Sequence, residues 1–267
     1  MTNNKISVVI PLYNGEKVIA RALDSIRNQT IMVDEIIIVN DGSTDNSINE
    51  INNYIKLHCF NIIKLINKEN GGVSSARNEG IKYSKNEIIA FLDCDDEWVS
   101  NKTEIQLQYI DDVDVVVVGG NHFQQKLKFI SLRKCHAINQ IKLNDLLFKN
   151  YFQPSTVMVK KSAAIEINGF DNKQKYAEEG QFFYKLSTKG KLIHINTQLV
   201  IYDGGGKSGF GHSGLSKNII EMEKGELSNL KIAKEELNIN LFLYWIAVFF
   251  SIVKFIRRII LNKFNRG

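Results

Sequence analysis

The chain has 267 residues, 44% of them hydrophobic and 24% charged, which is an ordinary globular composition and excludes a disordered or fibrous protein. Its formal net charge of +5 belongs to the segment 241–267, which holds five cations and no acid, so the first 240 residues are balanced. They therefore predict no nucleic-acid surface. The three cysteines are far apart and odd in number, which argues against a disulfide framework. With no apolar signal region at the N-terminus, we expect a cytoplasmic protein.

The first half of the chain alternates apolar strands with amphipathic helices. Strands are predicted over 6–12, 35–39, 62–66 and 88–92, and helices over 18–26, 48–55, 73–83 and 98–110. Repeated strand–helix units in this order predict an α/β fold with a mainly parallel sheet and helices on both faces.

The second half is less regular. An apolar run over 113–118 opens it, short strands are predicted at 123–130, 156–159 and 192–195, and helices near 142–150 and 178–188. The main change in composition comes at about residue 240.

An acidic stretch, Asp93-Cys94-Asp95-Asp96, directly follows the predicted strand 88–92. Like charges this close raise one another's pKa, so such a cluster is expected beside a cation or a strong hydrogen-bond network. A divalent ion such as Mg2+ or Mn2+, held by one or two carboxylates plus phosphate oxygens, is one interpretation. The other is an acidic turn in which Asp95 or Asp96 caps the next helix, and this stretch alone does not decide between the two.

Polar residues follow the other predicted strands as well, and the carboxyl ends of parallel strands share one edge of a sheet. Asp41 can accept hydrogen bonds from a base or ribose, and Gly71 and Gly72 allow the backbone to approach a ligand. Arg77 offers a planar donor fork to a diphosphate. Singly these residues are most often a turn, a loop and a solvated side chain. Together they indicate a nucleotide.

The segment 6–98 resembles the nucleotide-binding half of the inverting family 2 glycosyltransferases, which have the GT-A fold. The matching pieces, in order, are SVVIPLYNGEKVIARALDSIRNQT, DEIIIVNDGSTDNS, NGGVSSARNEGI and IAFLDCDDEW. Four motifs in the right order are far more specific than a lone acidic triplet.

The resemblance implies a donor site for a UDP-sugar. Asp41 contacts the uracil, with Pro11, Tyr13 and Glu16 nearby; Asp93 lies near ribose and sugar; Cys94 lies between the two acids of this DxD motif; and Arg77 lies beside the donor. Asp95, with Asp93, binds the Mn2+ or Mg2+ that bridges the diphosphate and stabilises the departing UDP.

Glu178 and Glu179 resemble the family's acidic pair at the start of a helix. The second member is usually an aspartate that acts as general base, so the resemblance implies Glu179 as base and Glu178 as its partner. Taken without the resemblance, two glutamates at a helix N-terminus complement the helix dipole.

A glycine-rich stretch, 202–214, is typical of a mobile loop over an active site. Within it, Lys207 and His212 are candidates for contact with phosphate or metal, although a histidine in a loop is more often a surface residue.

The tail begins with thirteen apolar residues, 241–253, which fall short of the ~20 that span a bilayer. Beyond them Lys254, Arg257 and Arg258 are expected on one helical face, with apolar residues on the other. This pattern favours an interfacial helix on anionic lipid. A helix docked on the domain core remains the alternative for its first half.

The resemblance implies a GT-A domain over 1–240, with a nucleotide-binding half (1–112) and an acceptor-binding half (113–240), followed by a membrane-associating tail (241–267). It implies transfer of a hexose or N-acetylhexosamine to a glycan on a lipid diphosphate carrier at the inner face of the cell membrane, as in O-antigen or capsule assembly. The alternatives are a catalytically silent nucleotide-sugar-binding module and a nucleotidyltransferase. The latter expects a glycine-rich basic loop after the first strand, which residues 12–15 do not form.

Overall fold

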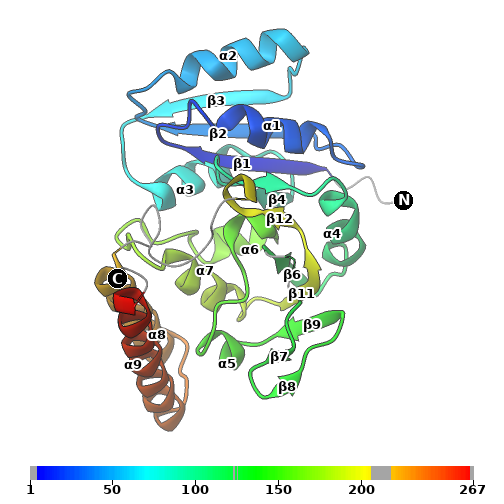
Figure 1. Cartoon of the computed structure of the whole chain (residues 1–267). Coiled ribbons are helices and arrows are strands. Elements are labelled where there is room, and N and C mark those ends of the chain that lie inside the picture. The colour runs from blue at the N-terminus through cyan, green and yellow to red at the C-terminus, as the bar shows by residue number, and fades with distance from the viewer. Residues whose placement is uncertain (1–4, 123, 125, 206–217, 265–267) are drawn as a thin grey trace.

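The computed structural model describes residues 5–122, 124, 126–205 and 218–264. Its centre is an eight-stranded sheet of order β3-β2-β1-β4-β10-β6-β11-β9, which crosses the whole molecule (Figure 1). The strands of this sheet are β1 (Ile6–Leu12), β2 (Glu35–Asp41), β3 (Ile63–Lys68), β4 (Ile88–Phe91), β6 (Val115–Asn121), β9 (Ile138–Ile141), β10 (Met158–Lys160) and β11 (Lys191–Gln198). Two small ribbons pair β5 (Glu97–Trp98) with β12 (Val200–Ile201), and β7 (Phe129–Ile130) with β8 (Arg133–Lys134).

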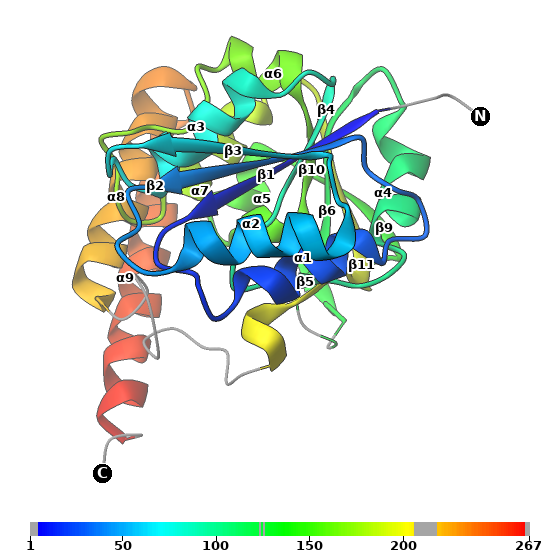
Figure 2. The same cartoon turned by 90° about the horizontal axis from the view of Figure 1, so that it is seen from above.

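The helices pack on both faces of the sheet. They are α1 (Ile19–Arg27), α2 (Ser47–His58), α3 (Val73–Tyr83), α4 (Lys102–Ile110), α5 (Leu143–Leu146), α6 (Lys161–Glu166), α7 (Glu178–Leu186), α8 (Ile219–Glu236) and α9 (Leu241–Phe264), with 3-10 turns at Pro154–Thr156 and Tyr202–Gly205. Figure 2 shows α1 and α2 on one face and α3 and α6 on the other. The predicted α/β architecture is confirmed.

Alternation along the buried strands divides the core into two layers. Val8 and Ile10 of β1 join the cluster under α1 and α2, whereas Val9 between them joins the cluster under α3, α6 and α7. A strand buried on both faces is apolar at nearly every position, which explains why these strands are near-continuous apolar runs.

The strand order departs from a purely parallel sheet at two places. β10 lies antiparallel between β4 and β6, and β9 is antiparallel to β11 at the edge. The strand predicted over 123–130 is too long, because among its described residues only Phe129–Ile130 is strand.

The last two helices, α8 and α9, lie side by side as a hairpin at the margin of the molecule (Figure 1). The first half of α9 packs on the domain: Ala247 is buried, and Leu243 and Tyr244 contact the core cluster. In the second half Lys254 and Arg258 form ion pairs with Glu226 of α8. The interpretation of Lys254 and Arg258 as part of a basic face free for lipid is therefore wrong. Within the part of the chain that the structure describes, no helix is both long and apolar enough for a membrane span.

A tight contact between α3 and β1 gives a first testable prediction. A Cβ on Gly80 would stand 2.2 Å from Val9 Cγ1 at the centre of the sheet. We expect Gly80→Ala to destabilise the fold by about 1–3 kcal/mol, although alanine is the better helix former, because overpacking outweighs propensity. Urea unfolding measures the change, and Lys82→Ala on the exposed side of α3 should stay within about 0.5 kcal/mol. A variant at Gly80 as stable as the parent chain would contradict the packing argument.

Candidate active site

The polar residues singled out in the first half lie along one edge of the sheet. β1, β2 and β4 are mutually parallel, so their carboxyl ends at Leu12, Asp41 and Phe91 face the same side. In Figure 2 this is also the side on which the α8–α9 hairpin lies. Ligands of open α/β sheets bind at this edge.

Asp41 at the end of β2 organises the neighbouring loop. Its Oδ1 accepts hydrogen bonds from the Gly71 N–H at 2.9 Å and the Lys68 ammonium at 2.6 Å, and its Oδ2 accepts from the Gly72 N–H at 2.8 Å. Gly72 has a φ of +85°, which glycine adopts without strain. The two loop N–H groups expected to meet an anionic ligand therefore bind the chain's own carboxylate.

The residues predicted near the base differ in exposure. Tyr13, just beyond β1, is 54% exposed and leaves its ring open to a ligand. Pro11 is buried within β1, beyond the last residue that pairs with β4 and opposite Val39 of β2. Glu16 accepts a hydrogen bond from the Asn46 N–H at 3.0 Å and so supports the loop after β2.

Asp96 is the buried member of the acidic stretch. It accepts hydrogen bonds from the Ser155 hydroxyl at 2.6 Å, the Gln153 amide at 3.0 Å and the Asp203 N–H at 3.1 Å. Burial, and then the charge of Asp93, raise its pKa to about 7. The N-cap of α4 is Asn101, so the interpretation of Asp95 or Asp96 as helix cap is wrong.

Asp95 is the exposed member and the best placed to hold a cation. Partial desolvation of its carboxyl, and then the charge of Asp93, raise the pKa of Asp95, and Asp203 adds to the negative field. Burial, and then the charges of Asp95 and Asp93, raise the pKa of the Cys94 thiol to about 12, so that thiol stays protonated. No three His, Cys, Asp or Glu side chains of the described ranges form a complete metal site. The donors present fit an ion that takes one or two carboxylates and completes its shell with phosphate oxygens.

Arg77 of α3 joins the two halves of the chain. Its side chain is 4% exposed, and its guanidinium binds Asp93 Oδ1 at 2.8 Å and Glu178 Oε1 at 3.0 Å. The Phe170 ring, stacked on Phe182, lies 5.2 Å from the guanidinium carbon. Arg77 thus links Asp93, in the acidic stretch after β4, to Glu178 at the start of α7.

Glu178 and Glu179 begin α7 directly after Ala177, a buried residue with a left-handed φ of 55°. Backbone strain of this kind is maintained by surrounding contacts, here the Asn229 amide of α8, which donates to the Ala177 carbonyl at 2.8 Å. Burial, and then the neighbouring charge of Glu178, raise the pKa of Glu179 to about 8. Glu178 is committed to Arg77, whereas Glu179 has the pKa of a general base that works near neutral pH.

Three supporting residues of the site went unnoticed in the sequence. The Asp93 N–H donates to Ser155 Oγ at 3.0 Å, and Ser155 and Gln153 both bind Asp96. No local pattern marks these two residues, because the turn at 154–156 reaches the site only through the sheet order. Asp203 had a signal, an acid opening the glycine-rich stretch. Lys207 and His212 of that stretch lie outside the described residues.

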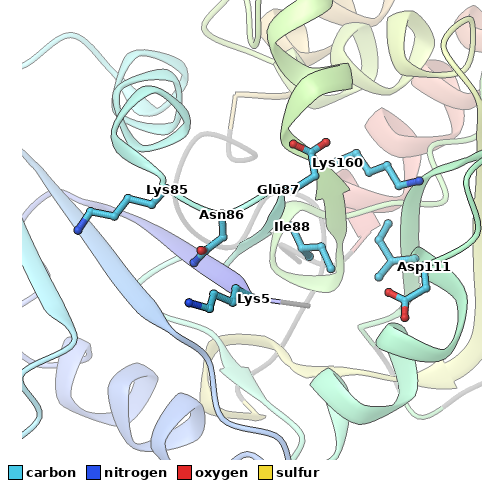
Figure 3. Close-up of a pocket in the computed structure, with 8 residues that line it drawn as sticks. Lys5, Lys85, Asn86, Glu87, Ile88, Asp111 and Lys160 are labelled. Carbon is cyan, nitrogen blue, oxygen red and sulfur yellow. The ribbon is translucent and has the colours of Figure 1, made fainter. Parts of the chain in front are cut away.

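A separate pocket lies at the opposite edge of the sheet (Figure 3). Lys5, before β1, and Ile88, at the start of β4, line it together with Asp111 and Lys160. These residues mark the amino ends of the parallel strands. The pocket therefore lies away from the acidic stretch and adds nothing to the candidate site.

Comparison with known sequences places this site in a family. The sequence profile of glycosyl transferase family 2 matches residues 7–171, more than half of the chain. The glycosyltransferase GlyG of Streptococcus pneumoniae is 29% identical over 215 residues, which cover 74% of this chain and 70% of GlyG. The chondroitin synthase of Pasteurella multocida is 31% identical over 196 residues, 72% of this chain but only 20% of that much longer enzyme.

Solved structures show the same fold. S. aureus TarS 1–349 in complex with UDP-GlcNAc matches with a TM-score of 0.68 at 17% identity, over 91% of this chain and 70% of that one. The mannosyltransferase PcManGT of Pyrobaculum calidifontis, in complex with GDP-Man and Mn2+, matches with a TM-score of 0.67 at 17% identity, over 94% and 74%. The expected GT-A fold is thereby confirmed, and the chain belongs to glycosyl transferase family 2.

Proposed function

We propose that this glycosyltransferase moves a hexose or N-acetylhexosamine from a UDP-sugar to a hydroxyl of a glycan, with inversion at the anomeric carbon. The observation that carries the proposal is the Arg77 bridge between Asp93 and Glu178. Because one guanidinium binds both Asp93 and Glu178, the acidic stretch after β4 and the Glu178–Glu179 pair lie close together. A donor and an acceptor can meet at this place. The UDP-GlcNAc complex of TarS supports uridine as the nucleotide.

On the donor side, the exposed Tyr13 ring and the Asp41 loop receive the uracil, and Asp93 lies toward ribose and sugar. Asp95, with Asp93, holds Mn2+ or Mg2+. The ion supplies Lewis-acid stabilisation of the diphosphate when bound. The Mn2+ in the PcManGT complex supports a divalent ion in this fold.

On the acceptor side, Glu179 is the general base. The acceptor oxygen bonds to the anomeric carbon while the bond from that carbon to the diphosphate oxygen breaks, and UDP leaves with the electron pair. The acceptor proton passes to the Glu179 carboxylate. Glu178 binds Arg77, and its neighbouring charge raises the pKa of Glu179 and so keeps that carboxylate basic.

The acceptor is proposed to be a growing glycan on a lipid diphosphate carrier at the inner face of the cell membrane, as in O-antigen assembly. The support for this part is the exposed apolar surface of α9, on the same side of the molecule as the site (Figure 2).

The test is UDP release from a panel of UDP-sugars, with GDP-mannose as the competing donor, in Mn2+, in Mg2+ and in EDTA. We expect release from one UDP-sugar, its loss in EDTA, and at least a tenfold drop in Asp95→Ala, since the carboxylate is a charged ligand of the ion. Asp171→Ala, a change in the turn before α7, is the matched acidic control.

Release that persists in EDTA would remove the metal from the proposal. Release of GDP from GDP-mannose, with no UDP released from any UDP-sugar, would overturn the uridine assignment. Isothermal titration with UDP separates a missing acceptor from a wrong donor, because the nucleotide should bind even where no transfer occurs.

A further inference from the structure

The helix α9 presents a long apolar stripe to the outside of the molecule. We call it the outer face of α9 and define it by Phe242, Trp245, Phe249, Val253, Ile256 and Ile260. These side chains are between 46% and 76% exposed. Their spacing of three and four residues places them on one side of the helix over its whole length. A contiguous apolar surface of this extent marks an interaction site rather than ordinary surface.

The opposite side of α9 is polar where it leaves the core. Ser251 Oγ donates to Glu223 of α8 at 2.9 Å, and Glu226 of α8 binds Arg258 at 2.8 Å and Lys254 at 3.3 Å. A helix that only packs on its own domain in water turns its apolar side inward and its charges outward. The second half of α9 does the reverse, so its outer face is built for an apolar neighbour.

The charge on α9 indicates which kind of neighbour fits its outer face. The segment 241–267 contains no acid, so the same segment of a second copy offers no anionic partner to a cation beside the stripe. Among the side chains of α9 that the structure describes, the one exposed charge beside the stripe is Arg257. Exposed bulky aromatic residues with a flanking cation are the chemistry of a helix lying at a lipid surface that carries negative headgroups.

We propose that the outer face of α9 docks in the plane of an anionic lipid bilayer, with the helix axis along the membrane. The 24 residues of α9 extend roughly 36 Å at ~1.5 Å per residue, and the ion pairs to α8 keep the helix on the domain in this orientation. This docking builds on the membrane location in the proposed function, but it can be tested apart from sugar transfer, because vesicle binding requires neither donor nor acceptor.

The chain carries its own probe for this contact. It has two tryptophans: Trp98 is 3% exposed in the core, and Trp245 is 59% exposed on the outer face. Adding vesicles of phosphatidylcholine with phosphatidylglycerol should shift the emission of Trp245 to shorter wavelength, and the full-length protein should float with the vesicles. Trp245→Phe should keep the flotation and lose the shift.

Two variants test the surface itself. Phe249→Glu should weaken vesicle binding at least tenfold, whereas Leu132→Glu, at a fully exposed site on the β7–β8 turn, should leave it unchanged. Arg257→Gln should lower binding to anionic vesicles about fivefold and leave binding to phosphatidylcholine unchanged. Circular dichroism and thermal melting should match the parent chain for all three, because the altered side chains are exposed.

The proposal is overturned if the parent chain stays unbound at low salt. Sedimentation then identifies the occupant: a dimer that Phe249→Glu converts to a monomer would assign the outer face to a second copy of the chain. Vesicle binding that is equally strong in Phe249→Glu would also overturn it, by placing the lipid contact elsewhere.

Discussion

Glu179→Gln is expected to lower the turnover of sugar transfer by about 10²- to 10⁴-fold, the usual contribution of a positioned general base. Glutamine keeps the size of the side chain and removes only its capacity to accept the acceptor proton. UDP binding should be unchanged, because the donor residues at β1, β2 and β4 are not altered. Single-turnover transfer and UDP titration measure the two effects separately.

The pH dependence gives this prediction a second readout. With a pKa of about 8, Glu179 is protonated and inactive as a base below that pH, so kcat/KM should rise with pH through an apparent pKa near 8. This rise of kcat/KM with pH should disappear in Glu179→Gln. A rise centred near 4 to 5 would mean that another carboxylate is the base.

The raised pKa also affects stability, with the opposite trend. The pKa of Glu179 is the ordinary glutamate value of 4.5 in the unfolded chain and about 8 in the fold, so the folded state binds more protons between these values. Its contribution to stability is present below about pH 4.5 and is lost as the pH rises to about 8. Glu179→Gln should therefore melt higher than the parent chain at pH 8.5 and close to it at pH 5. A catalytically silent binding module would show no sugar transfer in the parent chain, and Glu179→Gln would then leave its UDP binding unchanged.

Arg77→Met is expected to reduce the stability of the fold by about 3–5 kcal/mol, since it leaves Asp93 and Glu178 without their shared cation. Denaturant unfolding at pH 7 measures this loss. Lys191→Met, which breaks an exposed ion pair with Asp114, should reduce stability by less than about 1 kcal/mol.

A double variant distinguishes the bridge from simple packing. Arg77→Met combined with Glu178→Gln should recover part of the lost stability, because one of the two unpaired charges is gone. Arg77→Lys keeps the charge but cannot bind two carboxylates in one plane, and should fall between the parent chain and Arg77→Met. If the stability losses of Arg77→Met and Glu178→Gln simply added in the double variant, Arg77 and Glu178 would not be energetically coupled.

The sequence predicted the elements whose signals are local. β1, β2 and β4 are built on mainly apolar runs, and α3 begins directly after Gly71-Gly72, as expected. β10 was recognisable as a strand, but its antiparallel place between β4 and β6 depends on pairing across the chain. No short stretch of the sequence shows which strands β10 pairs with.

The same limit applies to the site. The motifs identified the acidic stretch and the Glu178–Glu179 pair, but not the bond between Arg77 and Glu178, which are 101 positions apart. The direction of Lys254 and Arg258 was misjudged for a related reason, because helical periodicity places charges on a face without revealing that Glu226 lies opposite.

The Asp41 loop has a consequence for the rate and affinity of donor capture. Its carboxylate already fixes the Gly71 and Gly72 backbone in the free protein, with Lys68 completing the set. Ordering a backbone residue costs about 1–2 kcal/mol, and a nucleotide that meets this loop does not incur that loss of entropy. If the Asp41 loop receives the base as proposed, we expect rigid-body association there rather than folding of the loop around the base.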